Sequence, residues 1–514
     1  MGQTIDLSWI DITIICSYVA LLFGIAIWSS YGKKSNLFLA NKSLGWFAIG
    51  LTMWGTNVGP SMMIANASSG YEGGIAAGNF SWYAFPFICL LAFVFAPRYL
   101  GASVTTLPEY MGKRFGNKTR SYLAWYSIVT ILVSWLGLTL FAGGVFMSQI
   151  LDFPLWTCIT LLVIVAAVFT ISGGLKTIAY TNVYQMLLLI GVSILLVVMA
   201  TVKAGGLSTV AAQTPETYWK LFLPLSDKDF PWLAILLGYP IMGVWFWCTD
   251  QSMVQSVLGA KNLKQGQLGA NFCGWLKILD IPLFILPGIV CFLLLPNLGN
   301  TTDAYLQLVK HVFPPGLTGL VVVVMSAALI STIASALNAL STVFTMDIYL
   351  KTKEGNVTNE TIIRVGRMVV IFGALLSVFL AIAITFIQGL SFFNIFQSVL
   401  GFLAPPMTAA FLFAVFSKKT SEKAINLTLT AGTLLSLGTG VLYYTGVVFS
   451  GVHFLYISFG IFVALALFIL AFTFINQSVA ETSQVYQPLK IERRVKLVWL
   501  VLILVMIGLY VFFK

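Results

Sequence analysis

Hydroxyl and amide side chains recur inside an otherwise apolar stretch near the middle of the chain. They are separated by 4, 3, 4 and 3 residues, at Ser331, Ser335, Asn338, Thr342 and Thr345. Because an α-helix repeats every 3.6 residues, this spacing predicts one polar stripe along one helical face. Two interpretations stay open: small residues let helices pack closely, and hydroxyl oxygens are ligands for a cation.

A second apolar stretch, GWFAIGLTMWGTNVGPSMMIANASSGYEGG, contains helix-breaking residues. Gly55 adds flexibility and Gly59-Pro60 removes a main-chain donor, so a helix should break there. Inside a membrane, an unwound main chain is tolerated where it lines a cavity or binds an ion. A proline kink sealed by neighbouring helices is the alternative. Free carbonyls from this break, with the hydroxyls of Ser331 and Thr332, would suit a weakly held monovalent cation.

The composition places these two stretches in a membrane. The chain has 514 residues, 59% hydrophobic and only 9% charged, which is too apolar for a soluble protein. It predicts an all-α integral membrane protein with about 14 transmembrane helices and the lipid bilayer as its surroundings. The expected spans are roughly 9–30, 45–68, 76–97, 121–150, 154–172, 180–202, 232–256, 267–295, 316–348, 366–387, 392–416, 424–447, 452–475 and 496–513.

The charges sort by side of the membrane and do not form a basic patch for nucleic acid. With these spans, most lysines and arginines fall in alternate loops. The loops between them hold only Lys203, Lys220, Lys228 and Lys310. By the positive-inside rule, both termini are predicted on the outer side of the cell membrane. All six cysteines fall within spans, so no disulfide framework is expected.

Several long motifs resemble the sodium/solute symporter family, in particular its sodium/sugar cotransporter branch. They are VTTLPEYMGKRFG, FTISGGLKT, WFWCTDQSMVQSVLGAKN, GWLKILDIPLFILPGI and ALISTIASALNALSTVFTMDIY. The resemblance implies a leucine-transporter-like fold in one transmembrane domain. A leading helix (9–30) would precede two inverted five-helix repeats (45–202 and 232–416), with three trailing helices (424–513).

The resemblance also implies a sodium site between the broken first core helix and the eighth. Its ligands would be the carbonyls of Gly55, Val58 and Ala328 and the hydroxyls of Ser331 and Thr332. Asn338 and the later hydroxyls have no such role and are interpreted as interhelical hydrogen-bonding groups.

For the solute, the expected pocket combines fixed polar groups with aromatic faces. Asn57, Lys277 and Gln397 are the polar candidates, beside the block Trp245, Phe246 and Trp247. A lysine inside a span costs about 3 kcal/mol, so Lys277 should face a cavity or a partner. Asp280 could be that partner in a structural pair, whereas the resemblance implies contact with sugar.

Three positions depart from the sugar-carrier pattern. Met62 stands where those carriers have a polar residue, Ser81 replaces a glutamate before Trp82, and Phe246 replaces the tyrosine of the inner gate. We still count these positions as solute-lining, but fewer polar groups remain for recognition.

A fourth departure concerns the number of ions. Members of the family that use a second sodium ion tend to carry an aspartate in the fifth core helix and a Thr-Ser pair after the first site. This chain has Asn182 and Ala334-Ser335 there. A single coupling sodium per solute is therefore expected.

The resulting prediction is a sodium-coupled symporter for a monosaccharide or polyol, and not an enzyme. Another solute, such as a sialic acid, another organic acid or a nucleobase, is the alternative. Proton coupling is disfavoured because the spans lack a carboxylate relay. An integral-membrane enzyme would need paired carboxylates, a metal cluster or an activated nucleophile, and the sequence offers none.

Overall fold

A computed structural model describes residues 8–30, 38–314, 316–353, 357–384, 392–449, 451–476 and 488–514. Within these ranges the protein is helical, and the β pairing consists of two isolated bridges, Leu44 with Ala260 and Leu223 with Pro231. Eleven helical stretches of the described residues are long and apolar enough to cross a membrane. The expected all-α membrane architecture is confirmed.

The bounds of these stretches show how they relate to the predicted spans. They are Trp9–Trp28, Met62–Gly101, Asn117–Ser148, Leu155–Lys203, Trp232–Thr249, Leu263–Leu294, Thr318–Thr352, Asn359–Ile384, Glu422–Tyr444, Phe454–Ile475 and Arg493–Phe512. Leu155–Lys203 covers two predicted spans, and a further apolar helical stretch of the described residues is Leu400–Phe416. The count of fourteen spans stays a prediction.

The individual helices follow the chain in an uneven series of long and short pieces. The first part contains α1 (Trp9–Ser30), α2 (Trp46–Asn57), α3 (Pro60–Gly73), α4 (Asn79–Trp82), α5 (Phe85–Leu90), α6 (Ala96–Gly101), α7 (Leu107–Phe115), α8 (Asn117–Thr130), α9 (Thr139–Leu151), α10 (Leu155–Lys203) and α11 (Leu207–Gln213). The second contains α12 (Trp232–Val244), α13 (Gln251–Leu258), α14 (Leu263–Ile278), α15 (Leu286–Leu294), α16 (Ala304–Val312), α17 (Thr318–Val343), α18 (Leu350–Thr352), α19 (Asn359–Ile384) and α20 (Phe392–Phe416). The last three are α21 (Glu422–Tyr444), α22 (Phe454–Asn476) and α23 (Arg493–Phe512).

Several of these helices are joined by π-helical turns. They occupy Leu91–Phe95, Ile131–Leu138, Trp245–Thr249, Ile281–Ile285 and Phe344–Tyr349. A π turn inserts one residue and re-aims the side chains that follow it, and such turns are frequent at functional sites. Two of them, Ile131–Leu138 and Trp245–Thr249, carry residues of the cavity described below.

The predicted break in the second span is present. α2 ends at Asn57 and α3 begins at Pro60, with Val58 and Gly59 extended between them. Pro60 occupies the first turn of α3, where the missing N–H costs nothing and the fixed φ favours a helix start.

A second irregularity lies inside α10, where the sequence suggests a loop between two spans. The helix continues through this region except at Gly174, whose φ of 55° and ψ of −145° kink it. Glycine tolerates this left-handed φ because it has no Cβ. The chain therefore turns at one residue.

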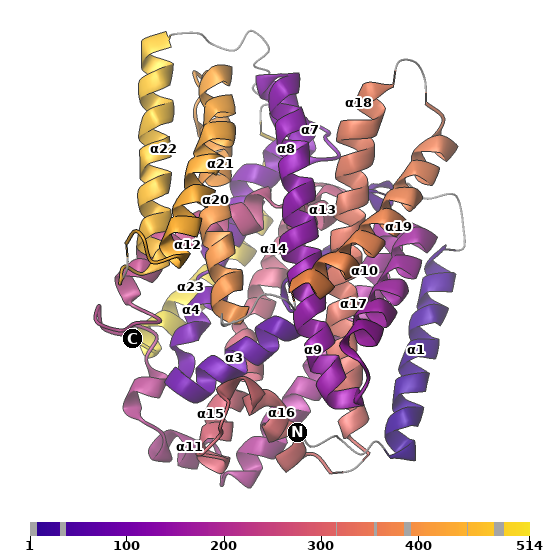
Figure 1. Ribbon diagram of the computed structural model, residues 1–514, viewed down its shortest axis with the longest axis vertical. Helices are drawn as coiled ribbons and strands as arrows, with labels where there is room; N and C mark the ends of the chain where they lie inside the picture. Colours follow the sequence, from indigo (N-terminus) through magenta and orange to yellow (C-terminus); the bar gives the residue numbers. More distant parts are fainter. Residues whose placement is uncertain are drawn as a thin grey trace.

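The packing places α17 at the centre of the molecule. α17 contacts α1, α2, α9, α10 and α19, and nearly all of its side chains are buried. α1 lies beside α10 and α17 on one side, whereas α20, α21 and α22 pack together on the other (Figure 1). The polar stripe of α17 therefore faces neighbouring helices.

Candidate functional site

The end of α2 presents main-chain oxygens to α17. The Gly59 N–H donates to Asn57 O, and Pro60 has no N–H. The carbonyls of Gly55 and Thr56 therefore lose the donors that a continuous helix would supply. The Thr332 hydroxyl oxygen lies 3.4 Å from each of these two carbonyl oxygens.

Another predicted ion ligand lies at the same point, and two more are buried, one in α17 and one in the break. The carbonyl oxygen of Ala328 is 3.1 Å from the Thr332 hydroxyl. Ser331 is 1% exposed, and its hydroxyl has no hydrogen-bond partner. Val58, fully buried, forms the break itself. A buried hydroxyl without a partner is unfavourable unless a ligand completes it. A group of neutral oxygens fits a monovalent cation such as sodium, which takes oxygen ligands from unwound helices.

Sequence reasoning missed one main-chain oxygen. The carbonyl of Thr56 is as close to Thr332 as that of Gly55. The sequence does indicate this free carbonyl, because a proline at position 60 removes the helical N–H donor to the carbonyl of residue 56.

A cavity of about 140 Å³ adjoins this oxygen cluster and shares Thr56 and Thr332 with it. Five of the seven predicted solute residues line the cavity. They are Asn57, Met62, Ser81, Phe246 and Trp247. Trp245 lines it too, so the whole aromatic block of the π turn faces the same space.

Lys277 is held behind the cavity by a buried ion pair. It contacts Asp280, which also accepts a hydrogen bond from the Trp54 indole at 2.9 Å. Lys277 Nζ donates to Asn57 Oδ1 at 2.8 Å. The paired arrangement left open by the sequence is therefore the observed one. Lys277 does not line the cavity itself but contacts Asn57, which does. A direct contact between Lys277 and solute stays a prediction.

The remaining solute candidate, Gln397, lies in the first part of α20. The side chains of residues 392–399 are outside the described residues. Its role stays a prediction.

The cavity wall also contains residues that sequence reasoning did not select. Asn66, Trp135, Thr139 and Tyr239 line it. Trp135 donates to Asp250 at 3.1 Å, and Asp250 caps α13 by accepting from the N–H groups of Ser252 and Met253.

The position that the resemblance assigns to a second ion is polar but uncharged in this chain. Asn182 is fully buried, and neither amide atom has a partner. Ser335 lies 3.1 Å from the Thr56 hydroxyl, which also donates to the Thr52 carbonyl. Without a carboxylate at residue 182, the positive charge of a second sodium would lack compensation there.

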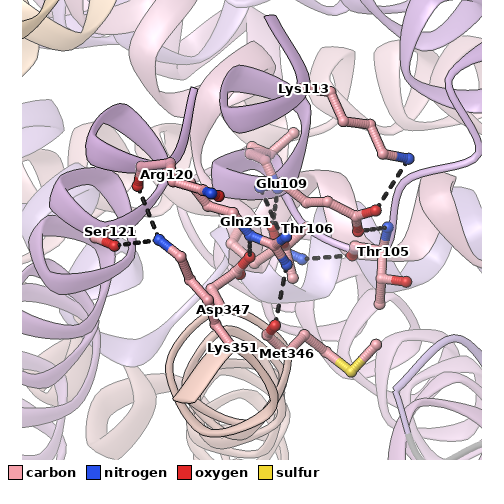
Figure 2. A network of polar contacts seen from close by, with 12 residues as sticks. Thr105, Thr106, Glu109, Lys113, Arg120, Ser121, Gln251, Met346, Asp347 and Lys351 are labelled. Carbon is pink, nitrogen blue, oxygen red and sulfur yellow. Dashed lines mark hydrogen bonds and ion pairs between the residues drawn. The ribbon is translucent and has the colours of Figure 1, made fainter. Parts of the chain in front are cut away.

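A separate polar network lies near the starts of α7 and α8. It joins them to the segment that follows α17 (Figure 2). Arg120 donates to Asp347 at 2.7 Å and to the Met346 carbonyl at 3.0 Å. Lys351 donates to the Asn117 carbonyl and to Ser121.

Two further contacts in this network bring α7 and α13 together. Gln251 accepts from the Leu107 N–H at 2.9 Å and donates to the Thr105 carbonyl at 3.3 Å. The contacts of Arg120 and Lys351 therefore fasten α8 to residues 346–351, and those of Gln251 join α7 to α13.

Two comparisons with known structures agree with this architecture. A Na⁺-coupled sialic acid symporter in a substrate-bound outward-open state superposes with a TM-score of 0.79, at 19% identity, over 91% of this chain and 98% of that one. A nucleobase-cation-symport-1 family transporter in a closed conformation gives a TM-score of 0.52 at 15% identity, over 88% and 96%. The leucine-transporter-like fold is confirmed.

Sequence comparison is more specific. Sodium/glucose cotransporter 1 of Ovis aries is 31% identical over 92% of this chain and 79% of its own length. Sodium/glucose cotransporter 4 of Homo sapiens is 31% identical over 86% and 70%. The model of the sodium:solute symporter family matches residues 37–432. The protein, a multi-pass membrane protein that couples solute transport to sodium, therefore belongs to the sodium:solute symporter family.

Proposed function

We propose that the protein imports a neutral monosaccharide or related polyol together with one sodium ion by alternating access. The observation that carries this proposal is the shared wall: Thr56 and Thr332 border both the oxygen cluster and the cavity. Names of relatives such as sodium/glucose cotransporter 1 support sugar as the solute class.

The break between α2 and α3 gives this wall a coupling role. Gly55 and Thr56 would offer carbonyls to sodium, and the next residue, Asn57, turns its side chain to the cavity. A sodium ion bound between α2 and α17 would fix the main chain at the break and thereby place the Asn57 amide. Solute affinity would then rise with sodium, and by linkage sodium affinity would rise with solute.

Charge favours a neutral solute. None of the described residues that line the cavity is acidic or basic. Lys277 is compensated by Asp280, so it is not a free cation for a carboxylate. Trp245, Phe246 and Trp247 provide flat apolar surfaces against which a sugar ring can lie.

One ion per solute follows from Asn182 and Ala334, which remove the charge and the hydroxyl of a second site. At about 100 mV and about a tenfold gradient, one sodium supplies about 3.7 kcal/mol, enough for about 500-fold accumulation. A reversal-potential measurement in proteoliposomes should give one charge per solute. Two charges per solute would contradict this stoichiometry.

The orientation in the cell membrane is also part of the proposal. Lys118 stands at the start of α8 in a lysine- and arginine-rich loop, which should be inside, whereas Lys228 should be outside with both termini. In intact cells, an impermeant thiol reagent should label the Lys228→Cys variant and spare Lys118→Cys. Labelling of Lys118→Cys and not of Lys228→Cys would show that the orientation is the opposite one.

The test of the function uses purified protein in proteoliposomes. Labelled hexoses and polyols should accumulate only when sodium, and not potassium, is supplied outside. A thermal-shift screen of sugars, polyols, organic acids and nucleobases in sodium and in potassium identifies the solute, because a ligand stabilises the state that binds it. Sodium-dependent stabilisation by an acid alone would replace the sugar assignment and keep the coupling.

A further inference from the structure

Asn66 is a polar residue of the cavity that neither the motifs nor the resemblance singles out. It lies on α3, four residues after Met62, and both side chains line the cavity. Asn66 is 7% exposed, and its Nδ2 has no hydrogen-bond partner. Because a buried amide donor without a partner is unfavourable, this group is poorly explained by folding alone.

The neighbouring wall shows what kind of partner would fit. α3 packs against residues 74–78, which contribute Ala77 to the same cavity, and α4 after them contributes Phe80 and Ser81. The Ser81 hydroxyl is buried and also lacks a partner. Two unpartnered polar groups thus stand on an otherwise apolar wall made of Met62, Ala77 and Phe80.

The orientation of Asn57 adds a third donor. Lys277 occupies Asn57 Oδ1, which leaves the NH₂ group of that amide for other partners. The cavity therefore offers amide N–H groups and a hydroxyl, and its described lining carries no charge. A neutral molecule with acceptor oxygens on one edge and a carbon face opposite complements this wall.

We propose that Asn66 determines solute specificity by donating a hydrogen bond from Nδ2 to one oxygen of the solute. The inference rests on the proposed function, since it assigns Asn66 to the same cavity and to a polyhydroxylated neutral solute. Met62 and Phe80 pack against the carbon atoms beside that oxygen. An oxygen of the bound solute accepts a hydrogen bond from Asn66 Nδ2, which has no partner within the protein.

The test compares three variants of the full-length protein. Asn66→Leu removes the donor at similar size, and Asn66→Asp keeps the shape while exchanging donors for acceptors. Asn271→Leu is the matched control, because Asn271 is buried on α14 with an unpartnered Nδ2 but does not line the cavity. The probes are the best-binding sugar of the thermal-shift screen and its series of monodeoxy analogues.

With wild-type protein, one deoxy analogue should bind about tenfold more weakly than the parent sugar, because the Asn66 donor is left unpaired. Asn66→Leu should lose about tenfold in affinity for the parent sugar and bind that one analogue nearly as wild type does. Asn66→Asp should lose at least as much, whereas Asn271→Leu should keep the wild-type ranking. Sodium binding without solute should not change in Asn66→Leu or Asn271→Leu.

A ligand-free measurement makes the proposal testable whatever the solute is. Replacing an unpartnered buried donor by an apolar group should leave the melting temperature of the sodium-free protein equal or higher in Asn66→Leu. A lower melting temperature together with an unchanged solute ranking would show that Asn66 serves the fold, and would overturn the proposal.

The same measurements test the sugar assignment and the role of Asn66 separately. If an acid or nucleobase binds and no sugar does, the sugar assignment fails, while a tenfold loss of that ligand in Asn66→Leu would still support the role of Asn66. If the parent sugar binds Asn66→Leu as tightly as wild type, the role of Asn66 fails and the sugar assignment stands.

Discussion

The middle of α17 and the segment that follows it, residues 344–352, both carry polar side chains between helices, but these side chains have different partners. In the middle, the Ser331 hydroxyl has no partner and Thr332 is surrounded by carbonyls of two helices. In the later segment, Asp347 is paired with Arg120, and Lys351 has two oxygen partners. Thr345 Oγ1 and Asp347 Oδ2 in the later segment also lack a partner, so the difference lies in charge: an open hydroxyl beside free carbonyls suits a cation, whereas an ion pair holds helices together.

The largest expected effect is on the paired side of this comparison. Arg120→Met would leave the fully buried Asp347 without its cation, which should lower the free energy of unfolding by about 3 to 5 kcal/mol. Thermal unfolding in detergent measures the loss. The double variant Arg120→Met/Asp347→Leu should recover most of it, and wild-type stability of the single variant would show that the pair is not structural.

On the unpaired side, Thr332→Ala should act on sodium and not on folding. Removing this hydroxyl should raise the sodium concentration for half-maximal uptake about tenfold or more, equivalent to about 1.4 kcal/mol, with the protein still folded. Thr342→Ala is the matched control, since Thr342 bonds to Gln255 and the Asn338 carbonyl on the same helix. Equal sodium dependence in Thr332→Ala and wild type would remove Thr332 from the site.

Ser331→Ala should change stability in opposite directions without and with sodium, relative to wild type. Without sodium, loss of an unpartnered hydroxyl should leave stability unchanged or raise it by up to about 1 kcal/mol. With sodium, the variant should gain less stability than wild type, because a ligand has gone. Thermal shifts across a sodium titration record both signs. A destabilised sodium-free variant would mean that Ser331 has a structural partner.

The smallest effect is expected at the exposed edge of the paired network. Lys351→Met removes hydrogen bonds to the Asn117 carbonyl and Ser121, but its side chain is exposed to solvent. Its loss should change stability by less than about 1 kcal/mol. A loss as large as that of Arg120→Met would show that the network acts as one unit.

The main features of the fold could be predicted from sequence because they depend on local chemistry. Apolar length gives the helices, and Gly59-Pro60 gives the break between α2 and α3. The π turns at Ile131–Leu138 and Trp245–Thr249 could not be predicted, since an inserted residue is stabilised by packing between distant segments. Around Gly174 the sequence predicts a loop, whereas the helix continues except for a kink at this one residue.

The candidate site was predictable where one motif holds several of its residues. Ser331 and Thr332 are adjacent, and Asp280 is visible three residues after Lys277. The Trp54 indole that joins this pair comes from another helix, and no sequence pattern shows that contact. Asn66 could have been found by stepping four residues along the helix from Met62, whereas Trp135 and Tyr239 could not.

The break in α2 has a consequence for how this transporter can change over evolutionary time. In the proposed sodium site, Gly55, Thr56, Val58 and Ala328 contribute main-chain oxygens, which almost any substitution leaves in place. The cavity beside it is built from side chains, and each of these can be exchanged by a single mutation. Solute specificity can therefore change by mutation while sodium coupling is retained. A paralogue with a new solute would begin with a working sodium site.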